Sequence, residues 1–336
     1  MAREGDLLET QDRLIFDVKG LVHPPDRVVA FPRFVPSCRG NRRRQGIAYK
    51  KIYALSERYE FLEEKLPHYL VSDPVFGERL CEVPKEDIKH HFDPIDRLQQ
   101  LRRSNCLDDL EADALNMTKL LQGYSKVPWD KVGISGSLLV KLHTPNSDID
   151  PVIYGRTNCL GVYEALNAMM RDEKSMLRPY TQEDLRTLHD FRSPDTIASF
   201  KDFVATEQRK VLQGRFLNHD FFVRCIVDRD EIDEHYGDAR YRNVGQARIK
   251  ATISDDSEAL FTPCKYPIYN VQVLNGKCPE PVSEISSFRG RFCEQARRGE
   301  RIVAQGKMER VQTKSGEAFV RLLLGGQPSD FMVLEV

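Results

Sequence analysis

The stretch from residue 133 to residue 155, GISGSLLVKLHTPNSDIDPVIYG, limits the fold more than any other part of the chain. It predicts a short strand around Lys131 to Ser135, a Gly-Ser turn, and a second strand from Ile149 to Tyr154. Because side chains alternate along a strand, Asp148 and Asp150 project to one face, roughly 6 to 7 Å apart along the backbone. The segment therefore predicts a turn and a pair of carboxylates on adjacent parts of one sheet.

The Gly-Ser turn has the composition of a phosphate-binding site. Gly136 lets the backbone come close to a ligand, a helix over LLVKL would point its first free N–H groups outward, and the Ser137 hydroxyl adds a donor. Mg²⁺ prefers oxygen ligands and usually takes one or two carboxylates together with substrate phosphates. Asp148 and Asp150 opposite this turn therefore indicate a metal-nucleotide site, although either feature alone would indicate only a surface turn.

A third carboxylate is expected on a later strand, because two-metal phosphoryl transfer normally needs a further acid to hold the ion that activates the incoming hydroxyl. The segment HDFFVRCIVD, residues 219–228, is dense in aromatic and β-branched residues and predicts a buried strand. Asp220 is the preferred ligand, and Arg224 on the same face would add positive charge near the phosphates. Asp228 is the alternative, although a loop start explains it more simply.

One pattern in residues 133–155 resembles the signature of the DNA polymerase beta type nucleotidyltransferase superfamily. It consists of Gly136-Ser137, ten further residues, and then Asp148-Ile149-Asp150. The resemblance implies an α+β catalytic fold with a mixed sheet, and two Mg²⁺ ions, for which Mn²⁺ is an alternative. It also implies transfer of a nucleoside monophosphate from an NTP such as ATP to a hydroxyl, with release of pyrophosphate. Its catalytic metal ligands map to Asp148, Asp150 and Asp220, and its phosphate-binding turn maps to Gly136 and Ser137.

The wider chain is similar, more loosely, to an uncharacterised, mainly archaeal branch of predicted nucleotidyltransferases. It departs from the pattern in three places. Ser135 stands where many members carry a bulky apolar residue, and Val140-Lys141 replaces an Arg-Gly pair, so Lys141 is expected to take over the cationic role. Pro151 follows the second aspartate and predicts a strand edge or bulge, because proline cannot donate a ladder hydrogen bond.

The pattern along the whole chain predicts an α+β protein of three parts. Strands are expected at 13–18, 27–35 and 48–55, and a helix is expected to start at Leu107 and stop at Gly123. Residues 156–214 look helical, whereas IVAQGKMERV, a Lys-Ser-Gly turn and AFVRLLLGG predict a hairpin in a module that suits a small barrel. The expected parts are an N-terminal α+β unit (1–104), the nucleotidyltransferase domain (105–236) and a C-terminal β-rich module (237–336).

Composition excludes several classes of protein. The chain has 50 Lys and Arg against 51 Asp and Glu, so a formal net charge of -1 implies no global attraction to nucleic acid or membrane. No apolar run approaches the roughly 20 residues that cross a bilayer, and the start lacks the order of a secretory signal, so we expect a cytoplasmic protein without membrane contact. The eight cysteines form no Cys-x-x-Cys pair, which argues against a disulfide framework or a zinc cluster.

The acceptor stays open at this stage between an RNA end, a protein hydroxyl and a small molecule. The run from Arg39 to Arg44 fits a contact with nucleic-acid backbone and a solvated hairpin loop equally well. Aromatic residues in the last hundred positions fit core packing better than a base-stacking surface. Two other functions remain as alternatives: a catalytically inactive nucleotide- or RNA-binding protein that keeps the fold, and a nucleic-acid-binding scaffold whose central part is structural.

Overall fold

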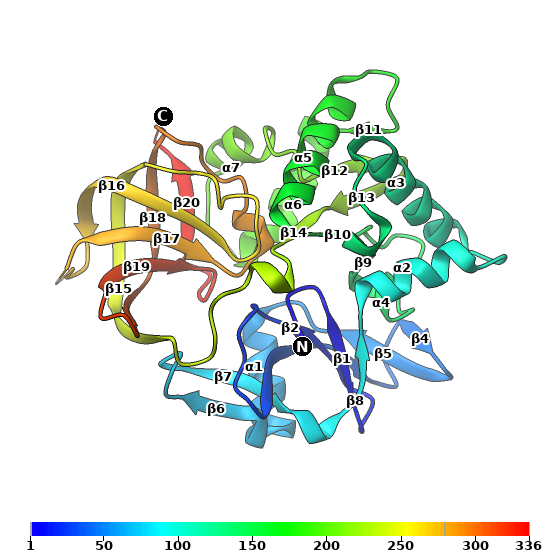
Figure 1. Ribbon diagram of the computed structural model, residues 1–336, viewed down its shortest axis with the longest axis horizontal. Helices are drawn as coiled ribbons and strands as arrows, with labels where there is room; N and C mark the ends of the chain where they lie inside the picture. Colours follow the sequence, from blue (N-terminus) through cyan, green and yellow to red (C-terminus); the bar gives the residue numbers. More distant parts are fainter. Residues whose placement is uncertain (1, 196, 279, 336) are drawn as a thin grey trace. The chain divides into compact units, whose positions relative to one another are not determined.

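The computed structural model describes residues 2–195, 197–278 and 280–335 and shows a mixed α+β protein, as the sequence predicts (Figure 1). The chain divides into two compact units. The first contains Met1–Val71, Leu80–Arg178 and Val211–Asp233, and the second contains Ser72–Arg79, Pro179–Lys210 and Glu234–Val336. The first unit therefore takes in most of both expected modules, 1–104 and 105–236.

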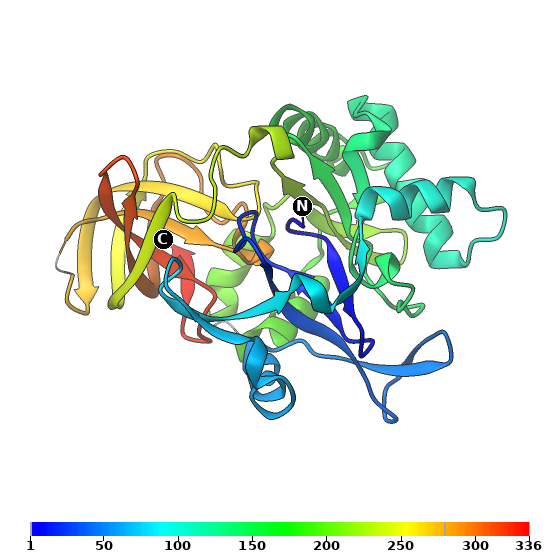
Figure 2. The same ribbon diagram turned by 60° about the horizontal axis from the view of Figure 1, so that its bottom comes forward.

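An N-terminal sheet of eight strands begins the chain (Figure 2). Six strands lie in the order β4-β5-β3-β2-β1-β8, and β7 pairs with both β3 and β6. Helix α1 (Leu55–Lys65) follows β5, and helix α2 (Pro94–Arg103) follows β8. The strands are β1 (Leu7–Thr10), β2 (Ile15–Val18), β3 (Arg27–Pro36), β4 (Arg42–Arg44), β5 (Ile47–Lys51), β6 (Leu70–Asp73), β7 (Glu78–Pro84) and β8 (Ile88–Phe92).

The three strands expected in this region are confirmed as β2, β3 and β5. The strand expected over 48–55 ends early, at Lys51, and α1 begins at Leu55. The reason is local, because the polar sequence SERYE after Leu55 favours a helix, with Glu57 in its first turn.

A second, three-stranded sheet carries the segment that the sequence singles out. Its order is β14-β10-β9, with β10 antiparallel to β9 and parallel to β14. Helices α3 and α5 pack against each other, and α5 also packs on β10. The elements are α3 (Asp109–Ser125), β9 (Val132–Ile134), α4 (Gly136–Leu139), β10 (Pro151–Tyr154), α5 (Arg156–Arg171) and β14 (Arg224–Ile226).

Three expectations for this region are wrong in detail. Helix α3 runs past Gly123 to Ser125, where Lys126 adopts the left-handed conformation that ends it. Pro151 marks no edge, since β10 is the central strand and proline is simply its first residue. Residues 156–214 are interrupted by β11 (Leu177–Arg178), and the expected helix stop at Gly214 lies in β12 (Gln213–Phe216).

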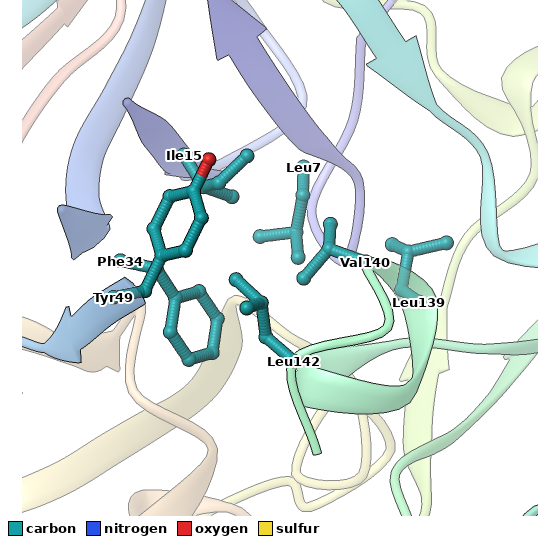
Figure 3. Close-up of a cluster of buried hydrophobic side chains, with 7 residues drawn as sticks. All are labelled: Leu7, Ile15, Phe34, Tyr49, Leu139, Val140 and Leu142. Atoms are coloured by element: carbon teal, nitrogen blue, oxygen red, sulfur yellow. The ribbon is translucent and has the colours of Figure 1, made fainter. Parts of the chain in front are cut away.

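The buried core of the first unit joins the N-terminal sheet to the segment around α4 (Figure 3). Phe34 and Tyr49 from the N-terminal sheet contact Leu139, Val140 and Leu142, which follow the Gly-Ser turn. These apolar side chains fix the position of the turn, because moving it would expose them to water at a cost of roughly 25 cal/mol per Å².

The second unit contains a closed β-barrel with two helices, α6 (Gln182–Arg192) and α7 (Phe200–Glu207). Five strands form a ring in the order β15-β16-β17-β19-β18, which closes because β15 also pairs with β18 (Figure 1). β17 and β19 are parallel, and β20 extends the sheet beside β18. The strands are β15 (Ala239–Ile253), β16 (Cys264–Asn275), β17 (Val282–Ser287), β18 (Arg301–Thr313), β19 (Ala318–Leu324) and β20 (Phe331–Leu334).

The C-terminal hairpin expected from the sequence is confirmed as β18 and β19, which pair antiparallel. Alternating residues of these strands, among them Met308 and Leu322, are fully buried in the barrel. In the described residues, no helix has the length and apolar character required to span a bilayer.

Candidate metal and nucleotide site

The strand register brings three aspartates to one face of the first unit. Ile149 forms a parallel bridge with Phe221, and its amide donates to the Asp220 carbonyl over 2.9 Å. Ile149 and Phe221 are both buried, so Asp148, Asp150 and Asp220 project from the opposite face. In this register Asp148 lies opposite Asp220, although the ligand oxygens of the three aspartates do not all lie within 4.8 Å of one another.

The Gly-Ser turn lies directly against the second of these aspartates. The Ser135 amide donates to the Asp150 carbonyl over 2.9 Å, and Gly136 follows with a φ of +63°. A β-carbon on Gly136 would lie 2.0 Å from the Oδ2 of Asp150. Only glycine tolerates both the left-handed backbone and this close approach, so the sequence of the turn is dictated by the carboxylate beside it.

The helix after the turn is shorter than the sequence suggests. α4 covers only Gly136–Leu139, and Ser137 is buried at its second position. Lys141 lies beyond the helix in a left-handed conformation, with an exposed side chain. A four-residue helix supplies few aligned peptide dipoles, so it adds little positive potential at the Gly-Ser turn.

The surroundings of Asp150 disfavour the charged form of its carboxylate. Burial, and then the negative charge of Asp148, raise the pKa of Asp150 to about 6, although Arg224, Lys51 and Arg33 oppose the shift. A divalent cation between Asp148 and Asp150 would remove their mutual repulsion. The pair therefore has the electrostatics of an ion-binding site.

The N-terminal sheet supplies cations to this face. Phe34 pairs with Lys51 across β3 and β5, so Lys51 projects to the side that packs on the α4 segment. Burial and the neighbouring Arg33 lower the pKa of Lys51 to about 8, while Asp148 and Asp150 favour its charged form. A half-buried lysine near two carboxylates is a suitable partner for phosphate oxygens.

Arg42 approaches the same place from β4. Its guanidinium donates to the Leu142 carbonyl and, over 3.3 Å, to the Ser147 hydroxyl, one residue before Asp148. Burial lowers the pKa of Arg42, and the charge of Asp148 opposes that change. The arginine-rich run is thus a strand with an inward-facing member, whereas Arg39 and Arg43 are exposed.

Arg224 also lies among these charges. It forms an ion pair with the buried carboxylate of Glu4, and it favours ionisation of Asp150 and Asp17. Although burial of Asp17 opposes its charge, Lys19 and several arginines hold its pKa below the usual value. Arg224 is therefore held by Glu4, which precedes β1, and it lies close enough to Asp150 to favour its ionisation.

Asp220 and its competitor Asp228 have different surroundings. The Asp220 side chain is 53% exposed and accepts from Arg215 on the neighbouring strand over 3.1 Å. Asp228 caps a short 3-10 helix and forms ion pairs with Lys131 and Arg3. Asp220 faces the same side as Asp148, whereas the contacts of Asp228 are those of a structural cap.

Among the described residues, the group of three metal-ligand side chains whose ligand atoms lie within 4.8 Å of one another is Asp108, Glu111 and His143, and Asp148, Asp150 and Asp220 do not form such a group. Asp108 and Glu111 form the capping box of α3, and His143 lies 2.7 Å from Asp108. Glu111 also pairs with Arg97. These hydrogen bonds and ion pairs explain the cluster without an ion.

Comparison with known proteins adds a relative of nearly equal length. The protein named "Uncharacterized protein MJ1086" from Methanocaldococcus jannaschii is 35% identical over 332 residues, which cover 96% of this chain and 95% of that protein. The chain belongs to the same family as this archaeal protein. The similarity spans both units of the chain. No protein-family model matches the chain, and no solved structure matches it.

Sequence reasoning missed the cations of the N-terminal sheet. Lys51 and Arg33 sit in ordinary strand sequences, and nothing in their spacing points to residues 148–150. For Arg42 the signal was present in the arginine-rich run, but the pairing of β4 with β5 decides which arginine faces the aspartates.

Proposed function

We propose that the protein is a Mg²⁺-dependent nucleotidyltransferase of the DNA polymerase beta type, which moves a nucleoside monophosphate from an NTP to a hydroxyl. The observation that carries the proposal is the close packing of Gly136 on Asp150, on the face that also holds Asp148 and Asp220. A turn without side-chain bulk beside paired carboxylates is what a metal-bound triphosphate requires.

The donor set fits magnesium, because it consists of carboxylate oxygens, which Mg²⁺ prefers as ligands. Asp148, Asp150 and Asp220 would hold two ions, which neutralise phosphate charge and lower the pKa of the acceptor hydroxyl when bound. Asp220 is largely exposed, so the acceptor is expected to approach from its side.

The chain's own residues would orient the triphosphate. The amides of Gly136 and Ser137 occupy the first helical positions, which have no acceptor within the helix. Lys51 and Arg42 would neutralise the outer phosphates, in place of Lys141. In the reaction the acceptor oxygen forms a bond to the α-phosphorus, the bond from that phosphorus to the bridging oxygen breaks, pyrophosphate leaves, and the hydroxyl proton passes to solvent.

The test is incubation of the full chain with each α-labelled NTP, Mg²⁺ or Mn²⁺, and a cell extract of RNA and protein. Label transfer is expected with the wild-type chain and should fall by about 10³-fold or more in Asp148→Ala, because charge neutralisation supplies most of the catalysis. Asp228→Ala is the matched control and should retain activity. Equal transfer by the wild-type and Asp148→Ala chains would rule the site out, and NTP binding without pyrophosphate release would favour a binding protein that keeps the fold.

A further inference from the structure

Two adjacent strands of the barrel, β15 and β16, carry basic side chains and no acidic ones. Strands β15 and β16 contain Arg240, Arg242, Arg248, Lys250 and Lys265 but no aspartate or glutamate. In a chain with 50 basic and 51 acidic residues, two long adjacent strands without a carboxylate are a local departure from balance. Among the described residues, Arg240, Arg242 and Arg248 have no carboxylate within 4.0 Å.

The strand register shows which side chains share the outside of the barrel. Ile249, Ala251 and Ile253 are buried inside it, so the residues that alternate with them project outward. Arg248 pairs with Asn275, Lys250 with Gln272 and Thr252 with Tyr269, and directly opposed residues point to the same side. Thr252 is buried, and we call the other five residues the β15–β16 face: Arg248, Lys250, Tyr269, Gln272 and Asn275.

The chemistry of the β15–β16 face combines aromatic, basic and amide groups. The Tyr269 ring is 48% exposed, which is unusual for a large aromatic side chain on a sheet. Gln272 and Asn275 are exposed as well, and Arg248 lies 5.3 Å from the ring centroid of Phe331 on β20. Among the described residues, Glu335 forms an ion pair with Lys250 over 2.5 Å.

We infer that the β15–β16 face binds single-stranded nucleic acid. An exposed ring stacks on any base, lysine and arginine neutralise the backbone, and amide side chains donate to and accept from base edges. The ring order β15-β16-β17-β19-β18, with a parallel β17–β19 pair, is the strand order of the OB-fold, in which the second and third strands commonly bind oligonucleotides. The fold alone would not establish binding, but its usual binding strand is the one that carries Tyr269 here.

This inference does not depend on the proposed nucleotidyl transfer, because the β15–β16 face belongs to the second unit and the aspartate face belongs to the first. Its direct test is fluorescence anisotropy of the full chain with labelled oligo-uridine, oligo-thymidine of the same length, and a duplex, at about 50 and 200 mM salt. The expected result is tighter binding of at least one single strand than of the duplex, with affinity falling as salt rises.

Two exposed substitutions locate the binding. Tyr269→Ala should weaken single-strand binding by about 5- to 100-fold, since stacking on one ring is lost. Arg248→Gln should weaken it less and should lower the salt slope by about 0.7. The matched controls are Tyr124→Ala, whose ring is 62% exposed on α3, and Arg298→Gln, which is exposed near Asp255.

Thermal melting checks that each variant remains folded, and the Asp148→Ala chain should bind the oligonucleotide as the wild type does. Comparison of the affinities for oligo-uridine and oligo-thymidine shows whether the protein distinguishes RNA from DNA. Tight binding of either one supports the inference. Absence of single-strand binding at low salt, equal binding of duplex, or unchanged binding in both Tyr269→Ala and Arg248→Gln would overturn it.

Discussion

The aspartate face of the first unit and the β15–β16 face of the second handle charge in opposite ways. Around Asp150, lysine and arginine side chains lie close to carboxylates in a partly buried cluster. The basic groups favour the charged form of Asp150, and the carboxylates favour the charged form of Lys51. On the β15–β16 face, Arg248 is exposed and has no carboxylate within 4.0 Å among the described residues, whereas Lys250 pairs with Glu335. A preorganised cluster of both signs suits a compact ligand that brings its own cation, whereas an open surface of one sign suits an extended polyanion.

The largest effect expected of a conservative change is that of Gly136→Ala. The added methyl group would lie 2.0 Å from the Asp150 carboxylate, and the φ of +63° is strained for alanine. Turnover of NTP should fall at least about 100-fold, and the variant should lose about 1 to 3 kcal/mol of unfolding free energy. Labelled-NTP turnover and chemical denaturation measure the two effects.

Gly123→Ala is the matched control for that change. No atom lies within 4 Å of a β-carbon at this position, and the residue is inside helix α3. The substitution should leave turnover unchanged and raise the unfolding free energy by about 0.5 to 1 kcal/mol, because alanine is the better helix former. Similar turnover in Gly136→Ala and Gly123→Ala would show that the packing of Gly136 on Asp150 does not matter for activity.

A smaller effect is expected from Lys51. The Lys51→Gln variant should raise the KM for NTP by about 10-fold with a lesser change in kcat, because the lost charge binds outer phosphates. In the wild type, affinity should fall as pH rises through about 8, the pKa of Lys51, since the ammonium group loses its proton there. The pH dependence should disappear in Lys51→Gln and move to higher pH in Lys51→Arg.

Lys50→Gln provides the comparison for Lys51→Gln, because Lys50 is the preceding strand residue and pairs with Glu57 at the surface. Its KM and pH profile should match the wild type. If Lys50→Gln and Lys51→Gln behave alike, Lys51 takes no part in phosphate binding.

The sequence predicts the aspartates better than the cations. Alternation along a strand places Asp148 and Asp150 on one side, and their part in a metal site stays a prediction. The single buried strand predicted over 219–228 is wrong in detail, because the structure has two strands in different sheets, β13 (His219–Phe222), which carries Asp220, and β14 (Arg224–Ile226). Lys51 lies near this face because β5 pairs with β3, and because Phe34 on β3 packs against the residues of and after α4. A pairing between segments about ninety residues apart leaves no periodic signal in either.

In the barrel, too, the sequence predicts pairing between neighbouring strands and does not predict pairing between distant ones. Its β18–β19 hairpin is visible in the sequence because a turn joins two adjacent strands. Closure of the ring depends on the pairing of β15 with β18, which lie on either side of two other strands in the sequence. The exposed ring of Tyr269 and the buried ring of Tyr266 are three residues apart, so only the register separates surface from core.

The smallest effect concerns stability. The pKa of Asp150, about 6, lies above its ordinary value, so the folded protein without metal takes up a proton between about pH 4 and 6 and its unfolding free energy falls as pH rises through that window. Asp150→Asn should therefore stabilise the metal-free protein at pH 8, by about 1 to 3 kcal/mol, and much less at pH 4. Denaturation at both pH values measures the difference.

Asp228→Asn should act in the opposite direction, because Lys131 and Arg3 help to hold the pKa of Asp228 below its ordinary value. Its loss should destabilise the protein at neutral pH, and the effect should fade as pH falls through the carboxylate range. Destabilisation by Asp150→Asn at pH 8 would contradict the repulsion assigned to the aspartate pair.

The most direct measurement is the anomalous scattering of Mn²⁺ in crystals of the full chain soaked with Mn²⁺ and a non-hydrolysable NTP analogue. The account predicts manganese peaks bounded by Asp148, Asp150 and Asp220, with the triphosphate against Gly136 and Ser137 and within reach of Lys51. Manganese bound instead at Asp108, Glu111 and His143, or a triphosphate bound away from the Gly-Ser turn, would contradict it.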